Sequence, residues 1–289
     1  MLISVVNHTH GKVSDARVQT VIRAVNRQIA EDFASHWHIT ARLRLVGTMD
    51  DEPIDPEAMP ELRGDAIIYL WDKANDNSRA LGLHKKSKLR GIPFGFVFHD
   101  LAEELDQDWT ITFSHEALEL IGDPEMNRLV RGPHPQHPDQ QVFYWYEMCD
   151  AVQDESYEID GVNVSNFVLP LYFTRDAEAG SRNDFLGKRH KKTILRSFGI
   201  NPGGYVGFFN PATGHNEIFG LADDKGRAAA RLAIKSKATL TRRSVRYATG
   251  LGYQAMVDTE LRIPDDRRGA PASQSTSGQR AVRKLKTAS

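Results

Sequence analysis

Cysteine is almost absent from this sequence, which holds Cys149 alone among 289 residues. A single cysteine excludes an internal disulfide framework and a zinc site made of cysteines. Long apolar runs are also missing, because no segment approaches the roughly 20 apolar residues that span a membrane. We therefore expect no membrane partner for this chain.

An excess of charge of either sign is missing as well, because 37 Lys and Arg oppose 38 Asp and Glu, for a formal net charge of -1. No overall positive field therefore favours nucleic acid as a partner. The first residues, Met1 to Val6, are mostly apolar and lack the basic segment and cleavage site of a signal peptide. We expect a buried strand at this position and a cytoplasmic protein.

Apolar residues make up 40% of the chain, and their periodicity predicts an α+β fold with a mixed sheet around a full core. The run Ala66 to Trp71 is apolar throughout, which is typical of a central strand. The elements predicted before residue 100 are strands at 2–7, 39–46, 66–71 and 94–99, a helix from Asp15 to about Trp37, and loops at 50–63 and 80–93. The last of these strands is expected at an edge of the sheet, where it can bind an extended peptide by pairing with it.

A further helix is predicted around the segment TFSHEALELIGD, Thr112 to Asp123. Asp108 is a suitable N-cap, and Gly122 followed by Pro124 ends the helix. Apolar side chains recur along one face at helical spacing, at Trp109, Phe113, Ala117 and Leu120. We expect this face to be buried, with a cleft beside it.

This helix carries the motif His115-Glu116-x-x-Glu119. Residues four apart lie on the same helical face, so His115 and Glu119 can bind one metal ion. Glu116 then lies where the general base of a metal-dependent hydrolase is needed, as in the His-Glu-x-x-His helix of zinc peptidases. The alternative is an ordinary amphipathic helix whose His and Glu side chains face solvent.

A third metal ligand has to come from outside the helix. Glu147 is our first choice, and Asp150 is its substitute or a partner that orients it. Glu125 competes with both of them, because it lies ten residues beyond His115 and just after the end of the helix. Asp123 is a weaker candidate.

Aromatic residues 143–146 precede Glu147 and supply a candidate for a second catalytic role. The phenol of Tyr146, or that of Tyr144, can donate a hydrogen bond to a developing oxyanion. The neighbouring segment 131–140 is rich in proline and contains His134 and His137, which could bind metal. We expect this segment to be a flexible surface loop.

The rest of the chain predicts a β-hairpin region followed by a basic tail. Asp160-Gly161 is typical of a hairpin turn, and a second hairpin is expected between Tyr205 and Phe219. Residues 223–263 form a basic extension, and residues 264–289 have the composition of a disordered basic tail. Only this C-terminal region favours contact with nucleic acid.

Several short motifs between residues 2 and 219 form a recognisable combination. They are Ser114-His115-Glu116-x-x-Glu119, Asp123-Pro124, Tyr146-Glu147-x-Cys149-Asp150, Tyr157-Glu158-Ile159-Asp160-Gly161-Val162, Val164-Ser165-x-Phe167-Val168, Ala80-Leu81-Gly82-x-His84, Gly91-x-Pro93-x-Gly95-x-Val97-Phe98 and Gly203-Gly204-Tyr205. Together they resemble a family of bacterial and phage-associated zincin-like metallopeptidases. The resemblance implies a zincin-like domain over residues 1–222, with an active-site helix, and places Glu125 at the spacing that other zincins use for their third ligand. It implies no particular substrate.

The sequence as a whole predicts a metal-dependent peptidase that acts on a peptide or protein. Zinc is the expected ion, with calcium or manganese as alternatives, since a site with one histidine and two carboxylates is harder and more anionic than a three-histidine site. The alternative function is a catalytically inactive metal-binding module or a structural module associated with a phage particle. In that case the protein is expected in the virion.

Overall fold

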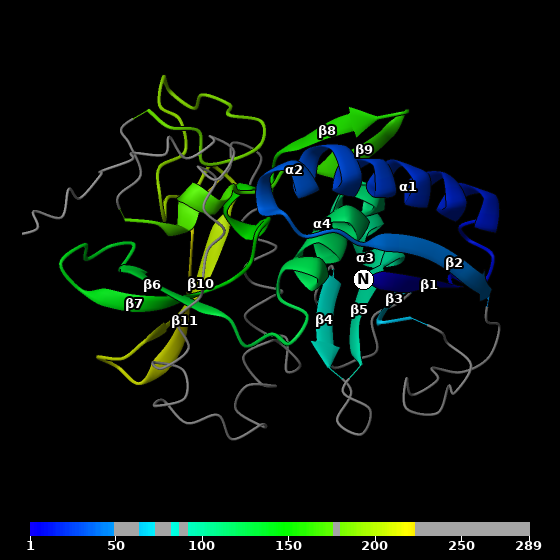
Figure 1. The fold of residues 1–289 in the computed structure, drawn as a ribbon, viewed down its shortest axis with the longest axis horizontal. Helices are drawn as coiled ribbons and strands as arrows, with labels where there is room; N and C mark the ends of the chain where they lie inside the picture. The colour runs from blue at the N-terminus through cyan, green and yellow to red at the C-terminus, as the bar shows by residue number, and fades with distance from the viewer. Residues whose placement is uncertain (49–63, 73–81, 87–91, 176–179, 223–289) are drawn as a thin grey trace, which may run out of the picture.

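The computed structural model describes residues 1–48, 64–72, 82–86, 92–175 and 180–222 (Figure 1). This part of the chain is a mixed α/β structure with few helices and three sheets, of five, four and two strands. The predicted loop at 50–63, the basic extension at 223–263 and the tail at 264–289 lie outside the described residues. Among the described helices, none is long and apolar enough to cross a membrane.

The five-stranded sheet has the strand order β2-β1-β3-β5-β4. Its strands are β1 (Leu2–His8), β2 (Arg42–Thr48), β3 (Ala66–Trp71), β4 (Gly82–Lys86) and β5 (Pro93–Phe98). Strands β2, β1, β3 and β5 run parallel, whereas β4 is antiparallel to β5. Every residue of β3 is buried, which confirms the prediction of a central strand at 66–71.

Strand β4 corrects two predictions. The segment 80–93 was expected to be a loop, but Gly82–Lys86 pairs with Pro93–Val97. Strand β5 is therefore internal, and the edge of the sheet is β4 rather than the strand at 94–99. Glycine and clustered basic residues weaken the local strand pattern, so this pairing depends on the neighbouring strand and not on local propensity.

Helix α1 (Asp15–Arg27) begins where the sequence predicts, because the Ser14 side chain accepts a hydrogen bond from the backbone N–H of Arg17. It continues as a π-helical stretch, Gln28–Phe33, and as α2 (Ala34–Trp37), and the helical region ends before His38, whose φ is 54°. The predicted end near Trp37 is confirmed.

The five-stranded sheet separates two apolar clusters. Helices α1 and α4 (Trp109–Gly122) lie on the face from which alternate residues of β1 and β3 enter the main core, among them Val5, Ile68 and Leu70. The opposite face carries a smaller, mainly aromatic cluster that includes Tyr69 and Trp71. The short helix α3 (His99–Glu104), which the sequence analysis did not predict, connects β5 to the segment before α4.

Helix α4 (Trp109–Gly122) has the predicted boundaries. The Asp108 side chain accepts a hydrogen bond from the backbone N–H of Thr110 at 3.0 Å, and the helix ends at Gly122. All residues from Thr112 to Gly122 are buried. The alternative of a solvent-facing His and Glu surface is therefore wrong for this helix.

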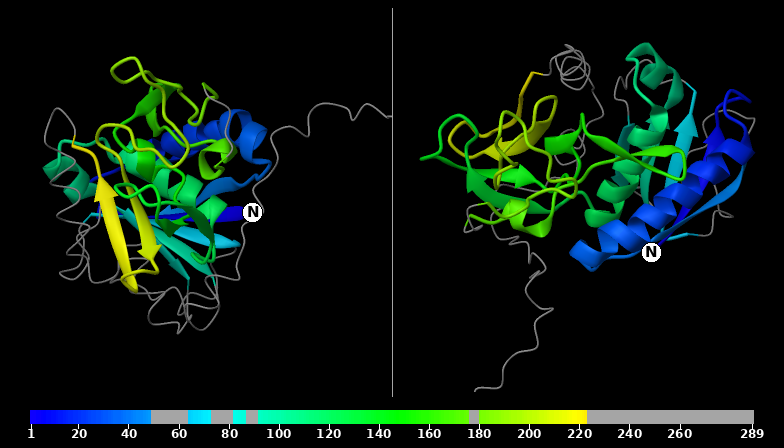
Figure 2. Two further views of the ribbon diagram at one scale, coloured as in Figure 1. Left: turned by 90° about the vertical axis from the view of Figure 1, so that its left-hand side faces the viewer. Right: turned by 90° about the horizontal axis from the view of Figure 1, so that it is seen from above.

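A second sheet lies beside α4, on the side away from α1 (Figures 1 and 2). Its antiparallel strands are β6 (Leu129–Pro133), β7 (Gln141–Trp145), β10 (Tyr205–Asn210) and β11 (His215–Gly220), in the order β11-β10-β7-β6. A small hairpin of β8 (Ser156–Ile159) and β9 (Val162–Ser165) packs on α4. Both predicted hairpins are confirmed. Two short 3-10 helices, Asp150–Val152 and Pro170–Phe173, complete the described elements.

The proline- and histidine-rich segment 131–140 is a surface loop only in its second half, where residues 136–140 form an exposed turn. Its first residues belong to β6, and His134 is buried against Phe208. The Nδ1 atom of His134 accepts hydrogen bonds from the backbone N–H groups of Gln136 and His137, at 3.1 and 3.3 Å. His134 thus stabilises the turn between β6 and β7.

Candidate metal centre

Three acidic or imidazole side chains meet at the junction of α4 and the 3-10 helix that begins at Asp150. The Nε2 atom of His115 lies 3.3 Å from Oε1 of Glu119 and 3.3 Å from Oδ1 of Asp150. The ligand atoms of all three residues lie within 4.8 Å of one another. His115, Glu119 and Asp150 are 5%, 3% and 2% exposed, respectively. These three side chains could hold a metal ion.

The backbone that precedes Asp150 is fixed to α4 by direct contacts. The N–H of Cys149 donates to Oε1 of Glu119 at 3.3 Å, and its thiol lies 3.9 Å from the carbonyl oxygen of His115. Helix α4 is close enough to this segment that a Cβ atom at Gly122 would lie 2.0 Å from Cε of Met148. A glycine that ends the helix therefore also permits the approach of the segment that carries Asp150.

Two carboxylates around one imidazole favour a positive charge at this cluster. Burial by itself lowers the pKa of His115, but the carboxylates of Glu119, Asp150 and Glu116 outweigh burial and raise that pKa well above 6.5. Without a metal, the protonated imidazole therefore stabilises the fold below about pH 6.5, and this contribution is lost as the pH rises through the pKa of the folded state. A divalent cation can take the place of the proton, because metal binding requires neutral imidazole.

The structure separates the sequence-predicted ligands into two groups. Asp150 joins His115 and Glu119, whereas Glu147 and Glu125 are not among the three clustered residues. Glu147 is half-buried and Glu125 is exposed. The weaker candidate, Asp123, accepts hydrogen bonds from the backbone N–H groups of residues 127 and 128, and so holds the turn after α4.

The two candidate catalytic residues differ in their position. Glu116 is 7% exposed, and its charge acts on His115, although it is not one of the three clustered ligands. Tyr146 instead packs against the rings of Trp37 and Phe173 in the core, where burial raises the pKa of its phenol. Its environment is that of a core tyrosine.

A segment that the sequence analysis did not select lies beside the turn that carries Asp150. Tyr205, the first residue of β10, is buried, and the Gly204 backbone before it packs on the turn at Asp150, where a Cβ atom at Gly204 would lie 3.1 Å from the Asp150 carbonyl oxygen. The sequence contains one local signal for it, the Gly203-Gly204 pair that immediately precedes it. Paired glycines permit a close backbone approach, but they do not reveal which segment is approached.

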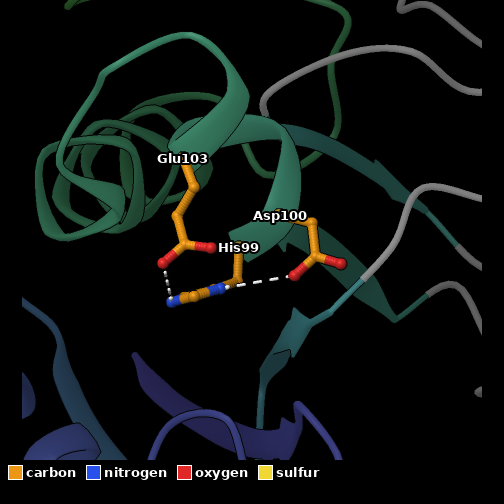
Figure 3. Close-up of side chains that lie close together, drawn as sticks. All are labelled: His99, Asp100 and Glu103. Carbon is orange, nitrogen blue, oxygen red and sulfur yellow. Dashed lines mark hydrogen bonds and ion pairs between the residues drawn. The ribbon is translucent and has the colours of Figure 1, made fainter.

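A second cluster, of His99, Asp100 and Glu103, could also hold a metal ion. Figure 3 shows that the His99 ring lies between the two carboxylates, with Nδ1 3.5 Å from Asp100 and Nε2 3.7 Å from Glu103. Different ring nitrogens therefore face different carboxylates. Asp100 is also bound by the ammonium group of Lys12, and the Glu103 side chain is 69% exposed. This arrangement suits a metal ion less well than the buried cluster on α4.

Comparisons with known proteins give no further information on either cluster. No family model, no curated protein and no solved structure matches the chain.

The position of the third ligand leads to a test. We expect Asp150→Ala to weaken metal affinity by roughly 10-fold or more, because it removes a clustered carboxylate. Glu147→Ala and Glu125→Ala are the matched controls, and each should change the affinity much less. Competitive titration with a zinc chelator measures all three variants. A larger loss in either control than in Asp150→Ala would move the ligand assignment to that glutamate.

Proposed function

We propose that this chain is a zinc-dependent peptidase with a zincin-like fold. The observation that carries the proposal is the buried group of His115, Glu119 and Asp150 on and beside α4, with Glu116 next to His115 in the sequence. Catalytic zinc sites use three protein ligands and leave a fourth position for water or substrate. One histidine and two carboxylates fit such a site, since imidazole nitrogen and carboxylate oxygen are both zinc ligands.

The proposed roles of these residues follow from their positions on and beside α4. His115 and Glu119 would hold the ion from one face of α4, and Asp150 would complete the ligand set. When bound, zinc supplies Lewis acidity, which lowers the pKa of a coordinated water and polarises a carbonyl group. Glu116 would accept a proton from the attacking water and transfer it to the leaving amine.

The edge strand next to α4 supports a peptide or protein as the substrate. Strand β4 is the antiparallel edge of the five-stranded sheet, and α4 packs against both β4 and β5. An extended peptide can pair with an edge strand through main-chain hydrogen bonds. Such a peptide would lie on the side of the sheet edge that is next to the metal-bearing helix, with its scissile bond oriented by β4.

The burial of the three ligands favours a second candidate function. Structural metal sites are closed, whereas catalytic sites keep an open position, and here every ligand is at most 5% exposed. A metal-binding module without catalytic activity, for example a structural component of a phage particle, would need only the closed site. Calcium or manganese would then compete with zinc, because two of the three ligands are carboxylates.

One experiment on the wild-type protein distinguishes these functions. We expect about one zinc per chain after purification and dialysis, together with hydrolysis of a mixed peptide library that a chelator abolishes and added zinc restores. The measurements are elemental analysis and mass spectrometry of the products. Protein that contains no zinc and takes up none on titration would contradict the proposal. Stoichiometric metal without hydrolysis would favour the binding module.

A further inference from the structure

Exposed basic side chains are concentrated in the long connection between the 3-10 helix Pro170–Phe173 and β10. They are Arg182, Lys188, Arg189, Lys191, Lys192 and Arg196, and we call residues 182–196 the basic loop. The one acidic residue of this loop is Asp184, which is fully buried. Because the chain as a whole has a net charge of -1, the basic loop is a local concentration of positive charge.

The cations of the basic loop are open to an external partner. Among the described residues, none of the six basic side chains forms an ion pair. Arg182 lies over the ring of Phe185, 5.5 Å from its centroid. Arg189 donates a hydrogen bond to the carbonyl oxygen of Lys192 at 3.4 Å. Neither contact removes a positive charge, so the loop attracts anions from solvent.

Buried polar contacts fix the backbone of the basic loop. The Oδ2 atom of Asp184 accepts hydrogen bonds from the N–H of Gly187 and from the side-chain amide of Asn166, both at 2.8 Å. Further along the loop, Nε2 of His190 lies 2.6 Å from Oε1 of Glu155, which is 4% exposed. The loop therefore presents its cations from a backbone that is anchored at two points.

A tight turn holds two of the lysines. The backbone N–H groups of His190 and Thr193 each donate to the carbonyl oxygen of the other residue, at 2.8 and 3.0 Å. Between them, Lys191 and Lys192 have φ angles of 49° and 72°. Such left-handed conformations are uncommon for residues other than glycine and persist where surrounding contacts impose them. The two exposed lysines are thus fixed next to each other at the turn.

The lack of an exposed apolar anchor in the basic loop favours one kind of anionic partner. Among the described residues, the large apolar side chains that are exposed all lie outside the loop, at Met1, Val46, Ile218 and Leu221. A membrane surface attracts basic side chains by only about 1 kcal/mol each, and stable attachment needs a second signal such as a lipid anchor. Nucleic acid needs no such anchor, because its closely spaced phosphates supply affinity through counterion release.

We propose that the basic loop is a docking surface for duplex nucleic acid, which it binds through phosphates and without sequence preference. Proteins that favour single strands stack unpaired bases on aromatic rings. The one phenyl ring of the loop, that of Phe185, instead packs on Phe167 and Tyr157, with centroids 5.0 and 5.2 Å apart. Residues 225–246 of the sequence add basic side chains and no acidic one, which favours the same partner.

The test measures binding of the full chain to a short DNA duplex of random sequence over a range of salt concentrations. A triple variant, Lys188→Gln with Lys191→Gln and Lys192→Gln, should weaken binding by roughly 10-fold or more at low salt. It should also reduce the slope of log affinity against log salt by roughly 2 to 3, because each lost phosphate contact contributes about 0.9. A second duplex of unrelated sequence should give the same values.

The matched control makes the same charge change at three exposed arginines of α1 and β2, with the substitutions Arg17→Gln, Arg23→Gln and Arg42→Gln. This control should keep the wild-type affinity and salt slope, and thermal melts should show that both triple variants fold. Equal affinity and slope in the wild type and the lysine variant would overturn the proposal, even if the rest of the chain binds DNA.

Three further probes separate duplex nucleic acid from other anionic partners. They are a DNA single strand of the same length, vesicles that contain phosphatidylserine, and polyglutamate. We expect the lysine substitutions to weaken binding to the duplex more than binding to any of these. A larger loss with the vesicles or with polyglutamate would assign the basic loop to a lipid surface or to an acidic protein, and a larger loss with the single strand would contradict the preference for a duplex.

Discussion

Glu116→Gln should lower peptide hydrolysis by roughly 10²-fold or more, while zinc content and melting temperature stay close to those of the wild type. Adjacent helical residues point about 100° apart, so Glu116 cannot share an ion with His115 and Glu119 without distortion of α4. Its proposed role is proton transfer. Glutamine keeps the size and hydrogen-bonding capacity of glutamate but cannot act as the base.

The matched control is Glu125→Gln, which makes the same change at an exposed glutamate just beyond the end of α4. We expect this control to retain full hydrolysis. Turnover numbers, zinc stoichiometry and thermal melts should be measured for both variants alongside the wild type. Equal turnover in Glu116→Gln and the wild type would remove Glu116 from the mechanism.

His115→Ala and Glu119→Gln should both abolish stoichiometric zinc binding but should differ in how far they destabilise the metal-free protein. At about pH 6, His115→Ala leaves the Glu119 and Asp150 carboxylates buried without their cation, which should destabilise the fold by about 3 kcal/mol or more. Glu119→Gln instead removes one carboxylate that pairs with protonated His115, but it leaves the imidazole beside Asp150 and keeps an oxygen that can accept from Cys149 N–H. We expect it to destabilise the metal-free fold less than His115→Ala does.

Elemental analysis and denaturant unfolding of the metal-free proteins test this pair. His99→Ala is the control for the second cluster, and it should leave the zinc content at about one ion per chain. Full zinc content in Glu119→Gln would be inconsistent with the proposed ligand set. Loss of zinc in His99→Ala and not in His115→Ala would transfer the site to the cluster shown in Figure 3.

Local signals in the sequence are sufficient to predict helix α4 and the two candidate ligands that it carries, His115 and Glu119. An aspartate at the N-cap, Asp108, and a glycine at the end, Gly122, act within one turn of the helix termini, so they determine its bounds without reference to the rest of the chain. The spacing of His115 and Glu119 is fixed by the helix itself. The central strand β3 is equally local, because an unbroken apolar run can be satisfied only by burial on both faces.

The remaining features depend on contacts between distant segments. Glu147 and Asp150 are equivalent as chemical candidates, and the choice between them depends on how the chain after β7 turns against α4. The start of β10, which packs on the turn at Asp150, lies far along the sequence, so no motif around the helix predicts this contact. The same is true of β4, whose strand conformation comes from its pairing with β5.

The ligand set joins two parts of the molecule. Helix α4 packs on the five-stranded sheet, whereas the turn at Asp150 is held by the start of β10 in the second sheet. A bound ion would therefore cross-link the two sheets, and their separation would open the ligand shell. Because the three candidate ligands are at most 5% exposed, we expect a bound ion to leave when this interface opens. The rate at which bound zinc exchanges with free zinc would then report the rate of that opening. We expect this exchange to be slow and to have the same activation energy as detachment of the second sheet from α4.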